Sequence, residues 1–422
     1  MAEVRPSPLT PDARAPWYAR SRTTRSLQVR DWRVLWMAGH LWHVAFWADL
    51  FILSWVVLEL TDSPFKVSLV GTFRLLPMGI LGLIAGSQAD RVSKKGLLLL
   101  AQGINLSVTS GFFVILALGL VQDWHVYLAA ALTGTAWAID LPVRRAFIRD
   151  ILPEQFMANA MALDVASLTG MAMIGRWLAG GLLTLAGVTV TYGLLIPIYV
   201  IGLLLLLSVP GRPVHTDVAG DPGGLLQGIW EGMVYTWRNK VLRGVVIITV
   251  FVNVLVFPYI QLTPVFARDV FDVGPALLGL MSGMDGFGAL VGTMVLASLV
   301  LVRRRGAIFI TGSLFMGIGA LLFGLSGSFA IAIPWLVVIG LGTSGFATMQ
   351  MTIAVTVPEP AMRGRAMGAV AFGIGLLPLG MLYMGLLAEW IGAPSALAYS
   401  ALSYVVILLA VILTQPVLRR FS

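Results

Sequence analysis

Four charged residues lie inside long apolar stretches of this chain: Asp49, Arg74, Arg176 and Asp285. An ionisable side chain is costly in apolar surroundings, so each of them is a default candidate for function. Such a group can bind a proton, pair with an opposite charge or contact a polar ligand. The stretches that hold these residues are long and do not alternate, which predicts helices rather than strands.

Asp49 and Arg74 are the candidates for proton coupling. At 1.5 Å per residue, Asp49 lies about 16 Å and Arg74 about 10 Å from the outer ends of two consecutive apolar stretches. Helices joined by a short loop pack as neighbours, so the two side chains could meet. Paired with Arg74, Asp49 would stay ionised. If Arg74 points elsewhere, desolvation favours the protonated acid and Asp49 becomes a good proton carrier.

The composition is that of a membrane protein. The chain is 58% hydrophobic and 11% charged, with a mean hydropathy of +0.90, whereas soluble domains carry about 25% charge. The apolar runs predict an all-α polytopic membrane protein with twelve transmembrane helices. The expected spans are 34–60, 67–88, 97–120, 125–147, 160–187, 189–209, 244–266, 275–301, 306–325, 329–352, 365–388 and 394–416.

The positive net charge is explained by membrane topology rather than by binding to nucleic acid. The net charge is +8, but the Lys and Arg residues outside the expected cytoplasmic segments are only Lys66, Arg74, Arg176 and Arg268. Excess positive charge marks the cytoplasmic side of a membrane protein, which places both termini on that side. We expect the protein to lie in the inner membrane. Cys is absent, the four His are scattered, and no phosphate-binding loop occurs, so we expect no metal or other cofactor.

The chain divides near its middle into two halves that repeat. Pro153, Glu154 and Met157 recur as Pro358, Glu359 and Met362 at a constant offset, which favours two six-helix pseudo-repeats. A polar linker separates them, with apolar residues every four positions from Leu225 to Trp237, as in a helix on a membrane surface. The expected units are a disordered basic tail at 1–32, the N-terminal half at 33–209, the linker at 210–243, the C-terminal half at 244–416 and a tail at 417–422.

Short motifs carry a resemblance to a known family. The loop from Gly86 to Lys95 has the spacing Gly-x-x-x-Asp-Arg-x-x-Lys-Lys and resembles the signature loop of the major facilitator superfamily of transporters, with Ser93 where that pattern has Gly. Leu141-Pro-Val-Arg144-Arg and Arg363-Gly-Arg-Ala-Met-Gly are similar to segments of its siderophore-exporter and macrolide-efflux branch. The resemblance implies the major facilitator fold and proton-driven export of an amphipathic small molecule.

The resemblance also implies a conformational latch on the cytoplasmic side, formed by charges that pair only when that side is closed. The expected members are Gly86, Asp90, Arg91, Lys94, Lys95, Asp140, Arg144, Glu154, Asp164, Glu359, Arg363 and Arg365. The alternative is that these residues only fix the topology. Orientation does not require an acid such as Asp90, which favours the latch.

In this superfamily the first, fourth, seventh and tenth helices line the central cavity, which implies a set of substrate contacts. The candidates are Trp42, His43, Phe46, Asn253, Tyr259, Gln261 and Gln350. An aromatic wall beside one acid suits a flat, apolar, cationic compound. The alternatives are that the aromatic residues serve packing and that His43 is a hydrogen-bonded interior residue.

Arg176 and Asp285 lie at one depth, about 16 Å and about 15 Å from the outer side, on the expected fifth and eighth helices. The family packs these helices face to face, so we expect an ion pair between the halves in one transport state. The alternative is that each charge bonds within its own half. The fifth helix also departs from the exporter pattern, because Arg176 follows Gly175 where Pro is usual.

The resulting interpretation is a secondary active transporter rather than an enzyme. Its expected partners are a small-molecule substrate, protons and membrane lipid, and the protein is expected to be monomeric. An importer, a uniporter or a lipid flippase of the same fold is the alternative within transport. A membrane-embedded acyltransferase is a further alternative, but its only candidate centres, His40 and His43, have no acid on their face of the helix.

Overall fold

The computed structural model describes residues 24–88, 92–211, 225–298 and 304–415, and within these ranges the regular structure is helical without strands. The first group of helices comprises α2 (Arg30–Thr61), α3 (Pro64–Gln88), α4 (Lys94–Ala117), α5 (Asp123–Ile151), α6 (Glu154–Gly193) and α7 (Leu195–Ser208). The second group comprises α8 (Leu225–Arg238), α9 (Lys240–Leu255), α10 (Tyr259–Val265), α11 (Pro275–Ser298), α12 (Arg305–Gly324), α13 (Phe329–Thr356), α14 (Arg363–Gly375), α15 (Leu377–Ile391) and α16 (Ala393–Thr414). Two short 3-10 helices are η1 (Arg25–Gln28) and η3 (Pro360–Met362), and η2 (Phe266–Val270) is a π-helix that follows α10.

Ten helical segments in the described ranges, two of them composed of consecutive shorter helices, are long and apolar enough to cross a membrane. The two further spans expected from the sequence fall on α3 and on the segment around α7. The side chains of α3 are described only as far as Gly79, and α7 has 14 residues. Helix α6 reaches 40 residues but is kinked at Gly187, where φ is 75°.

Prolines and one left-handed residue set other boundaries. The expected span 244–266 is divided before Pro258, and the expected span 365–388 is divided before Pro378, because proline has no amide hydrogen to donate to the preceding turn. Helix α2 ends at Asp62, which has left-handed backbone angles. The amphipathic helix expected in the linker is α8, and it packs along α14.

The N-terminal end of the described chain differs from the expected tail. Residues Arg25–Gln28 form a turn against α6, and Ser26 is fully buried. The Ser26 hydroxyl donates to the Asn159 side chain at 2.6 Å, while the indole of Trp32 donates to Ser26. Residues 24–32 are therefore part of the folded first helix group, because the polar groups of this segment bond to it.

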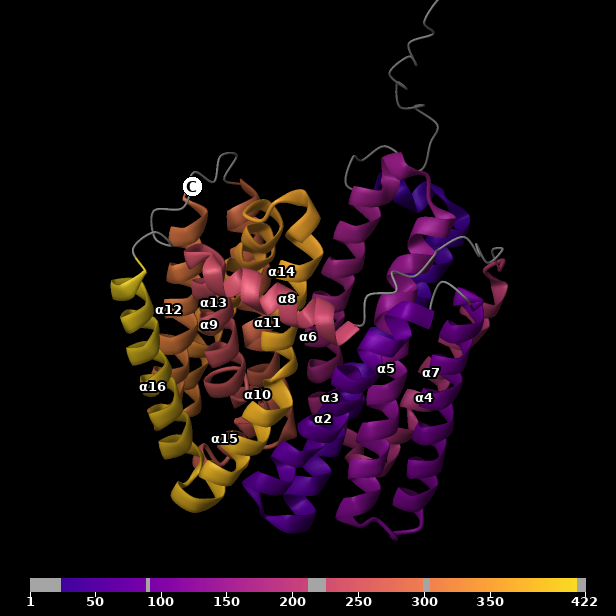
Figure 1. Cartoon of the computed structure of the whole chain (residues 1–422). Helices are drawn as coiled ribbons and strands as arrows, with labels where there is room; N and C mark the ends of the chain where they lie inside the picture. The colour runs from indigo at the N-terminus through magenta and orange to yellow at the C-terminus, as the bar shows by residue number, and fades with distance from the viewer. Residues whose placement is uncertain (1–23, 89–91, 212–224, 299–303, 416–422) are drawn as a thin grey trace, which may run out of the picture.

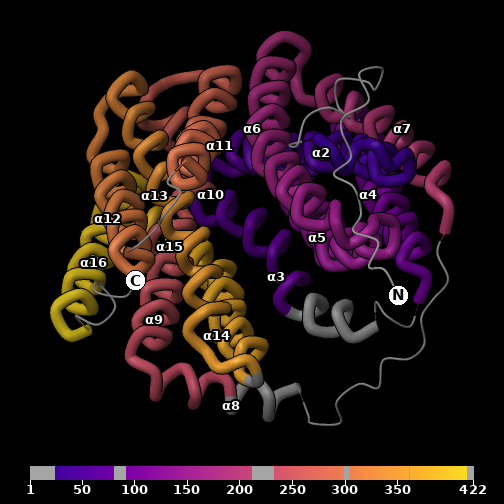
Figure 2. Tube along the Cα trace, turned by 90° about the horizontal axis from the view of Figure 1, so that it is seen from above, coloured from indigo at the N-terminus to yellow at the C-terminus, as the bar shows by residue number. Residues whose placement is uncertain are grey.

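Figure 1 shows α2–α7 in indigo through magenta to rose on one side and α9–α16 in rose through orange to yellow on the other. The groups meet along two seams, α6 with α11 and α3 with α15, and Figure 2 shows both seams from above. Glycines permit close approach at the α6–α11 seam, since a Cβ on Gly180 would overlap the carbonyl of Pro275 and one on Gly279 would lie 2.8 Å from the carbonyl of Arg176.

Gly134 of α5 provides a test of packing within the first group. A Cβ there would overlap the backbone carbonyl of Arg74 on α3. We expect Gly134→Ala to cost about 1–3 kcal/mol by forcing the two helices apart. Thermal unfolding of the purified protein measures this as a lowered Tm. The matched control is Gly103→Ala on α4, where a Cβ meets nothing within 4 Å; equal Tm values for the two variants would contradict the prediction.

Candidate functional site

Asp49 and Arg74 form an enclosed ion pair between α2 and α3, with side chains 0% and 1% exposed. Arg74 Nη1 also donates to Thr133 Oγ1 at 3.0 Å, and Nη2 donates to the carbonyl of Phe46 at 2.8 Å. Tyr192 of α6 donates its hydroxyl to Asp49 Oδ1 at 2.8 Å. The two opposite charges therefore balance one another, and hydrogen bonds satisfy most of their polar atoms, which makes burial tolerable.

Arg74 has acceptors besides the carboxylate. Its guanidinium carbon lies 3.9 Å from the centre of the Phe46 ring, in a cation–π contact. Together with the Thr133 hydroxyl and the Phe46 carbonyl, this ring can hold the guanidinium if Asp49 becomes neutral.

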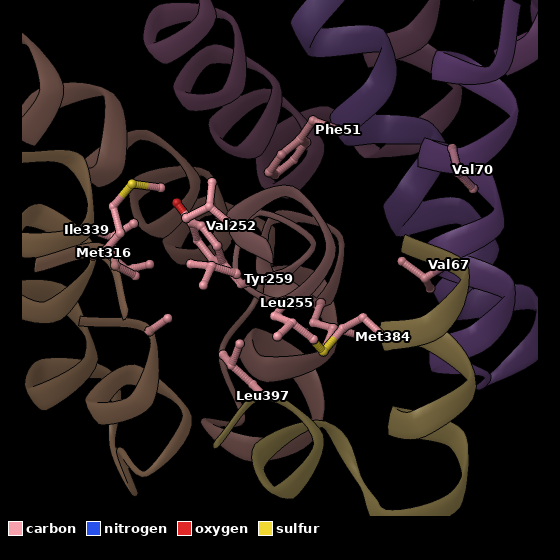
Figure 3. Packing of buried hydrophobic residues seen from close by; sticks show 14 of the residues in the cluster. Phe51, Val67, Val70, Val252, Leu255, Tyr259, Met316, Ile339, Met384 and Leu397 are labelled. Carbon is pink, nitrogen blue, oxygen red and sulfur yellow. The ribbon is translucent and has the colours of Figure 1, made fainter. Parts of the chain in front are cut away.

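A small cleft lies between the two helix groups, with a cavity volume of about 30 Å³. Its walls come from α2, α6, α10, α11 and α13. They consist of Trp47, Leu50, Phe51, Ser54, Arg176, Tyr259, Ile260, Gln261, Thr263, Pro264, Met281, Ser282, Asp285 and Leu336. Figure 3 shows Phe51 and Tyr259 among the buried side chains of this region. Aromatic and aliphatic walls with a few polar groups are typical of a small-molecule site.

Arg176 and Asp285 stand on opposite sides of the α6–α11 seam and are in contact, with Nη1 and Oδ1 3.4 Å apart. Arg176 also donates to the carbonyl of Ser282, and its guanidinium carbon lies 4.6 Å from the centre of the Trp47 ring. Tyr259 donates to Asp285 Oδ2 at 3.0 Å. Both charges are part-exposed, 11% and 19%, so this pair borders the cleft whereas the Asp49–Arg74 pair does not.

The expected substrate contacts are only partly in the cleft. Tyr259 and Gln261 line it. Trp42, His43 and Phe46 are at most 2% exposed and are not among its lining residues. Their face of α2 meets other helices of the first group, with Phe46 against Trp137. The face of α2 that borders the cleft instead carries Trp47, Leu50, Phe51 and Ser54.

Asn253 and Gln350 also lie away from the lining residues. Asn253 donates to the carbonyl of Thr249, and Gln350 donates to the Thr249 hydroxyl, so the three form one buried polar cluster of α9 and α13. Within this cluster the polar side chains form hydrogen bonds that lipid could not provide.

The described latch candidates bond within the first group or lie at the surface. Arg144 makes two bonds of 2.8 Å to Asp140, one turn away on α5, and both are buried. Lys94 pairs with Asp150 at 2.7 Å, and Lys95 donates to the carbonyl of Leu207. Ser93, where the family pattern has Gly, caps α4 by accepting from the amide of Gly96.

The other latch candidates are placed as follows. Asp164 is 7% exposed on α6, and the surface-exposed candidates are Glu154, Glu359, Arg363 and Arg365. Arg365 lies against α8, where a Cβ on Gly232 would sit 2.6 Å from its carbonyl oxygen. Gly86 belongs to the last turn of α3, and Asp90 and Arg91 lie outside the described residues.

Sequence reasoning missed Tyr192 and Thr133 as partners of the buried pair, and missed Trp47 and Phe51 as walls of the cleft. Tyr and Thr carry hydroxyls that are usually partnered when buried, which was the available signal for the first two. For the walls the sequence offered several aromatic residues on α2 but not the rotation of that helix.

Helices that can cross a membrane ten times, packed around enclosed ion pairs and an apolar cleft, define a polytopic membrane protein. Residues 23–420 match the family described as transmembrane secretion effector. The chain belongs to this family, which is part of the major facilitator superfamily of transporters and not a family of enzymes.

Relatives and solved structures agree with this placement. The chain is 26% identical to the multidrug efflux pump Tap of Mycobacterium tuberculosis, over 75% of this chain and 77% of that one. It is 22% identical to the staphyloferrin A transporter of Staphylococcus aureus, over 78% and 83%, and 26% identical to the enterobactin exporter EntS of Shigella flexneri, over 73% of each. A POT family transporter in complex with 5-aminolevulinic acid shares the fold, with a TM-score of 0.74 at 13% identity over 92% of this chain and 96% of that one.

Proposed function

We propose that this protein is a proton-coupled exporter of amphipathic small molecules that works by alternating access. The observation that carries the proposal is the cleft, which is built from both helix groups and is bordered by an ion pair that joins them. A site at such a seam can be exposed to either side when the groups rock. The relatives named for drug and siderophore export support the direction and the substrate class.

The proposed topology has twelve spans in two six-helix halves joined by the linker at 210–243, with both termini in the cytoplasm and the protein monomeric in the inner membrane. Helix α3 and the segment around α7 would supply the two spans beyond the ten. The concentration of Lys and Arg in the expected cytoplasmic segments supports the orientation.

The contacts between the groups suggest which side is closed. In this topology the turn between α2 and α3 is on the outer side, and bonds across the seam gather there. Ser63 donates to Glu389 at 2.8 Å, and Arg268 bonds to the carbonyl of Leu58 and pairs with Asp62, each at 2.9 Å. We therefore infer an inward-facing state, in which the outer side is closed. An importer or a flippase of the same fold would share these contacts.

Everted membrane vesicles test the function and its direction. With an imposed proton gradient, acidic inside, vesicles containing the protein should accumulate ethidium or rhodamine 6G, which are flat apolar cations. Accumulation should collapse when a protonophore removes the gradient. Uptake equal to that of vesicles without the protein, or accumulation only in right-side-out vesicles, would contradict proton-driven export.

Phe51 offers a test of the cleft as the binding site. It is an aromatic wall residue and is 6% exposed. We expect Phe51→Ala to raise the half-saturating ethidium concentration about tenfold, since loss of an aromatic contact costs about 1–3 kcal/mol. The control is Leu185→Ala, a residue of α6 that is 86% exposed. An unchanged half-saturating concentration in the Phe51 variant would place the site elsewhere.

A further inference from the structure

A row of unpartnered polar side chains lies inside the first helix group. Gln102, Asn105 and Thr109 of α4 and Tyr199 of α7 are each at most 1% exposed. Both side-chain polar atoms of Gln102 and of Asn105, and the hydroxyls of Thr109 and Tyr199, have no hydrogen-bond partner among the described residues. Buried polar groups are almost always bonded to protein or to ordered water, so six such atoms in one region need a partner.

These side chains share one junction of helices. Gln102, Asn105 and Thr109 are spaced by three and four residues, which places them on one face of α4. Helix α7 packs against both α4 and α2. At the junction, a Cβ on Gly202 of α7 would lie 3.8 Å from Gln102 Nε2 and 3.9 Å from the carbonyl of Ala38 on α2. The row therefore lies where α2, α4 and α7 meet.

Asp49 faces the same junction. On α2, Ala38, Ala45 and Asp49 are spaced by seven and four residues and so lie on one face of the helix. Asp49 lies twelve residues before the end of α2, and Asn105 lies twelve residues before the end of α4, which puts them at one depth. Asp49 also interacts electrostatically with Tyr199. The row thus spans the level of the carboxylate, with Thr109 one turn toward the outer side of Asn105 and Gln102 about one turn toward the cytoplasmic side.

The cleft gives Asp49 no direct access to a proton. Asp49 is fully buried and is not among the lining residues of the cleft. The charged and titratable groups against it are Arg74 of α3 and Tyr192 of α6, with Tyr199 of α7 within electrostatic range. None of the three borders the cleft, so a proton that reaches or leaves Asp49 needs another route.

We propose that the row of Gln102, Asn105, Thr109 and Tyr199 holds bound water, and that its part from Asn105 and Tyr199 to Gln102 carries protons between Asp49 and the cytoplasmic side, apart from the substrate cleft. The idea rests on the proposed role of Asp49 in coupling. A buried water makes about three hydrogen bonds, which these amides and hydroxyls can supply. In each transfer one O–H bond breaks as the next forms, so only a proton moves, and Asp49 is left as the carboxylate that pairs with Arg74.

An apolar layer closes the row at its cytoplasmic end. Leu98 precedes Gln102 by one turn of α4, Leu206 follows Gly202 by one turn of α7, and Leu35 precedes Ala38 on α2. The three leucines are fully buried in one cluster. Proton release to the cytoplasm therefore requires these helix ends to move, which ties it to the conformational cycle.

Radiolytic hydroxyl-radical labelling of the purified full-length protein tests the row for water. Radicals form at bound water, so Tyr199 should be modified about tenfold faster than a residue that is equally buried but dry. The dry reference is Phe323, which is 0% exposed and packs against Phe266 and Phe271. Equal rates for Tyr199 and Phe323 would show that the row is dry and overturn the proposal.

Leucine substitutions test the proton route. Gln102→Leu combined with Asn105→Leu should lower Tyr199 labelling to the Phe323 rate and slow proton release on ethidium addition about tenfold, because apolar side chains exclude the water. Ethidium affinity should not change, since the cleft is elsewhere. The control is Ser107→Leu on the exposed face of α4.

Proton release at the wild-type rate in the double variant would overturn the route, even with Tyr199 labelled. Wild-type protein that transports ethidium without releasing protons would instead remove the coupling assigned to Asp49, and the route with it. Because the labelling of wild-type Tyr199 needs no substitution, it decides the hydration of the row even if the double variant fails to fold.

Discussion

Asp49→Asn should abolish gradient-driven accumulation while leaving downhill exchange of substrate intact. Asparagine is close to aspartate in size, and its amide oxygen can accept from Arg74 while its NH2 group donates to the Tyr192 hydroxyl, but it cannot bind and release a proton. We expect uphill ethidium accumulation to fall at least about tenfold, because coupling requires a titrating group inside the membrane. Counterflow between vesicles and medium at equal pH, which needs no coupling, measures the exchange that should remain.

Under the proposed coupling, the structure offers Arg74 partners other than Asp49. When Asp49 is protonated, the guanidinium of Arg74 loses its counter-charge and must rely on Thr133, the Phe46 carbonyl and the Phe46 ring. Under the proposed coupling we expect protonation of Asp49 to shift Arg74 toward these partners and so to change how α2 and α3 pack. Intact uphill transport in Asp49→Asn would move coupling to another acid or remove it.

Folding must be controlled in this experiment, because removing one partner of a buried ion pair costs about 3–5 kcal/mol. The matched control is Asp49→Asn combined with Arg74→Gln, which removes both charges and leaves no buried cation. The double variant should regain thermal stability but not uphill transport. If it regains both, the loss in the single variant reflects the stranded charge of Arg74 and not the missing proton carrier.

Depth and connectivity were enough to suggest that Asp49 and Arg74 meet, since both follow from residue counts along straight helices. The same counts could not show that Tyr192 joins them. Tyr192 lies 38 residues beyond the start of α6 at Glu154 and just past the kink at Gly187, so its position depends on how α6 bends. Short-range geometry is readable from the chain, whereas a contact between distant helices depends on how they cross.

The rotation of α2 shows a second limit. Its sequence is aromatic on several faces, so Trp42 and Phe46 were as good candidates for the cleft as Trp47 and Phe51. Packing decides between them, because the Trp42–Phe46 face is covered by helices of its own group and the Trp47–Phe51 face meets α10 and α11. A helix without a polar face gives no periodic signal for its orientation.

Arg176→Gln and Asp285→Asn should each impair transport about tenfold, and exchanging the two charges should restore part of the loss. The pair is the charged contact on the α6–α11 seam, and both side chains border the cleft. Removing either partner leaves the other charge half-buried and unbalanced. In the exchanged variant, Arg176→Asp with Asp285→Arg, the hydroxyl of Tyr259 can accept where it now donates, but the Ser282 carbonyl loses its donor, so recovery should be partial.

The double-mutant cycle separates a coupled pair from two local roles. Residues in contact show interaction energies of about 0.5–3 kcal/mol, whereas independent sites add. The matched control is the surface pair of Lys66 and Asp123, whose side chains are 43% and 32% exposed and whose exchange should change transport little. Strictly additive losses at Arg176 and Asp285 would contradict the pairing.

The geometry favours a contact that opens during transport over a permanent lock. A separation of 3.4 Å is long for a charge-assisted hydrogen bond, and each charge keeps other partners: Ser282 and Trp47 for Arg176, Tyr259 for Asp285. Those partners can hold the two charges when α6 and α11 separate. A substrate in the cleft reaches both charges, so its binding can compete with the pair and bias the seam toward opening. Ethidium, as a cation, should then bind more weakly to Asp285→Asn than to Arg176→Gln; the opposite order would argue against this competition.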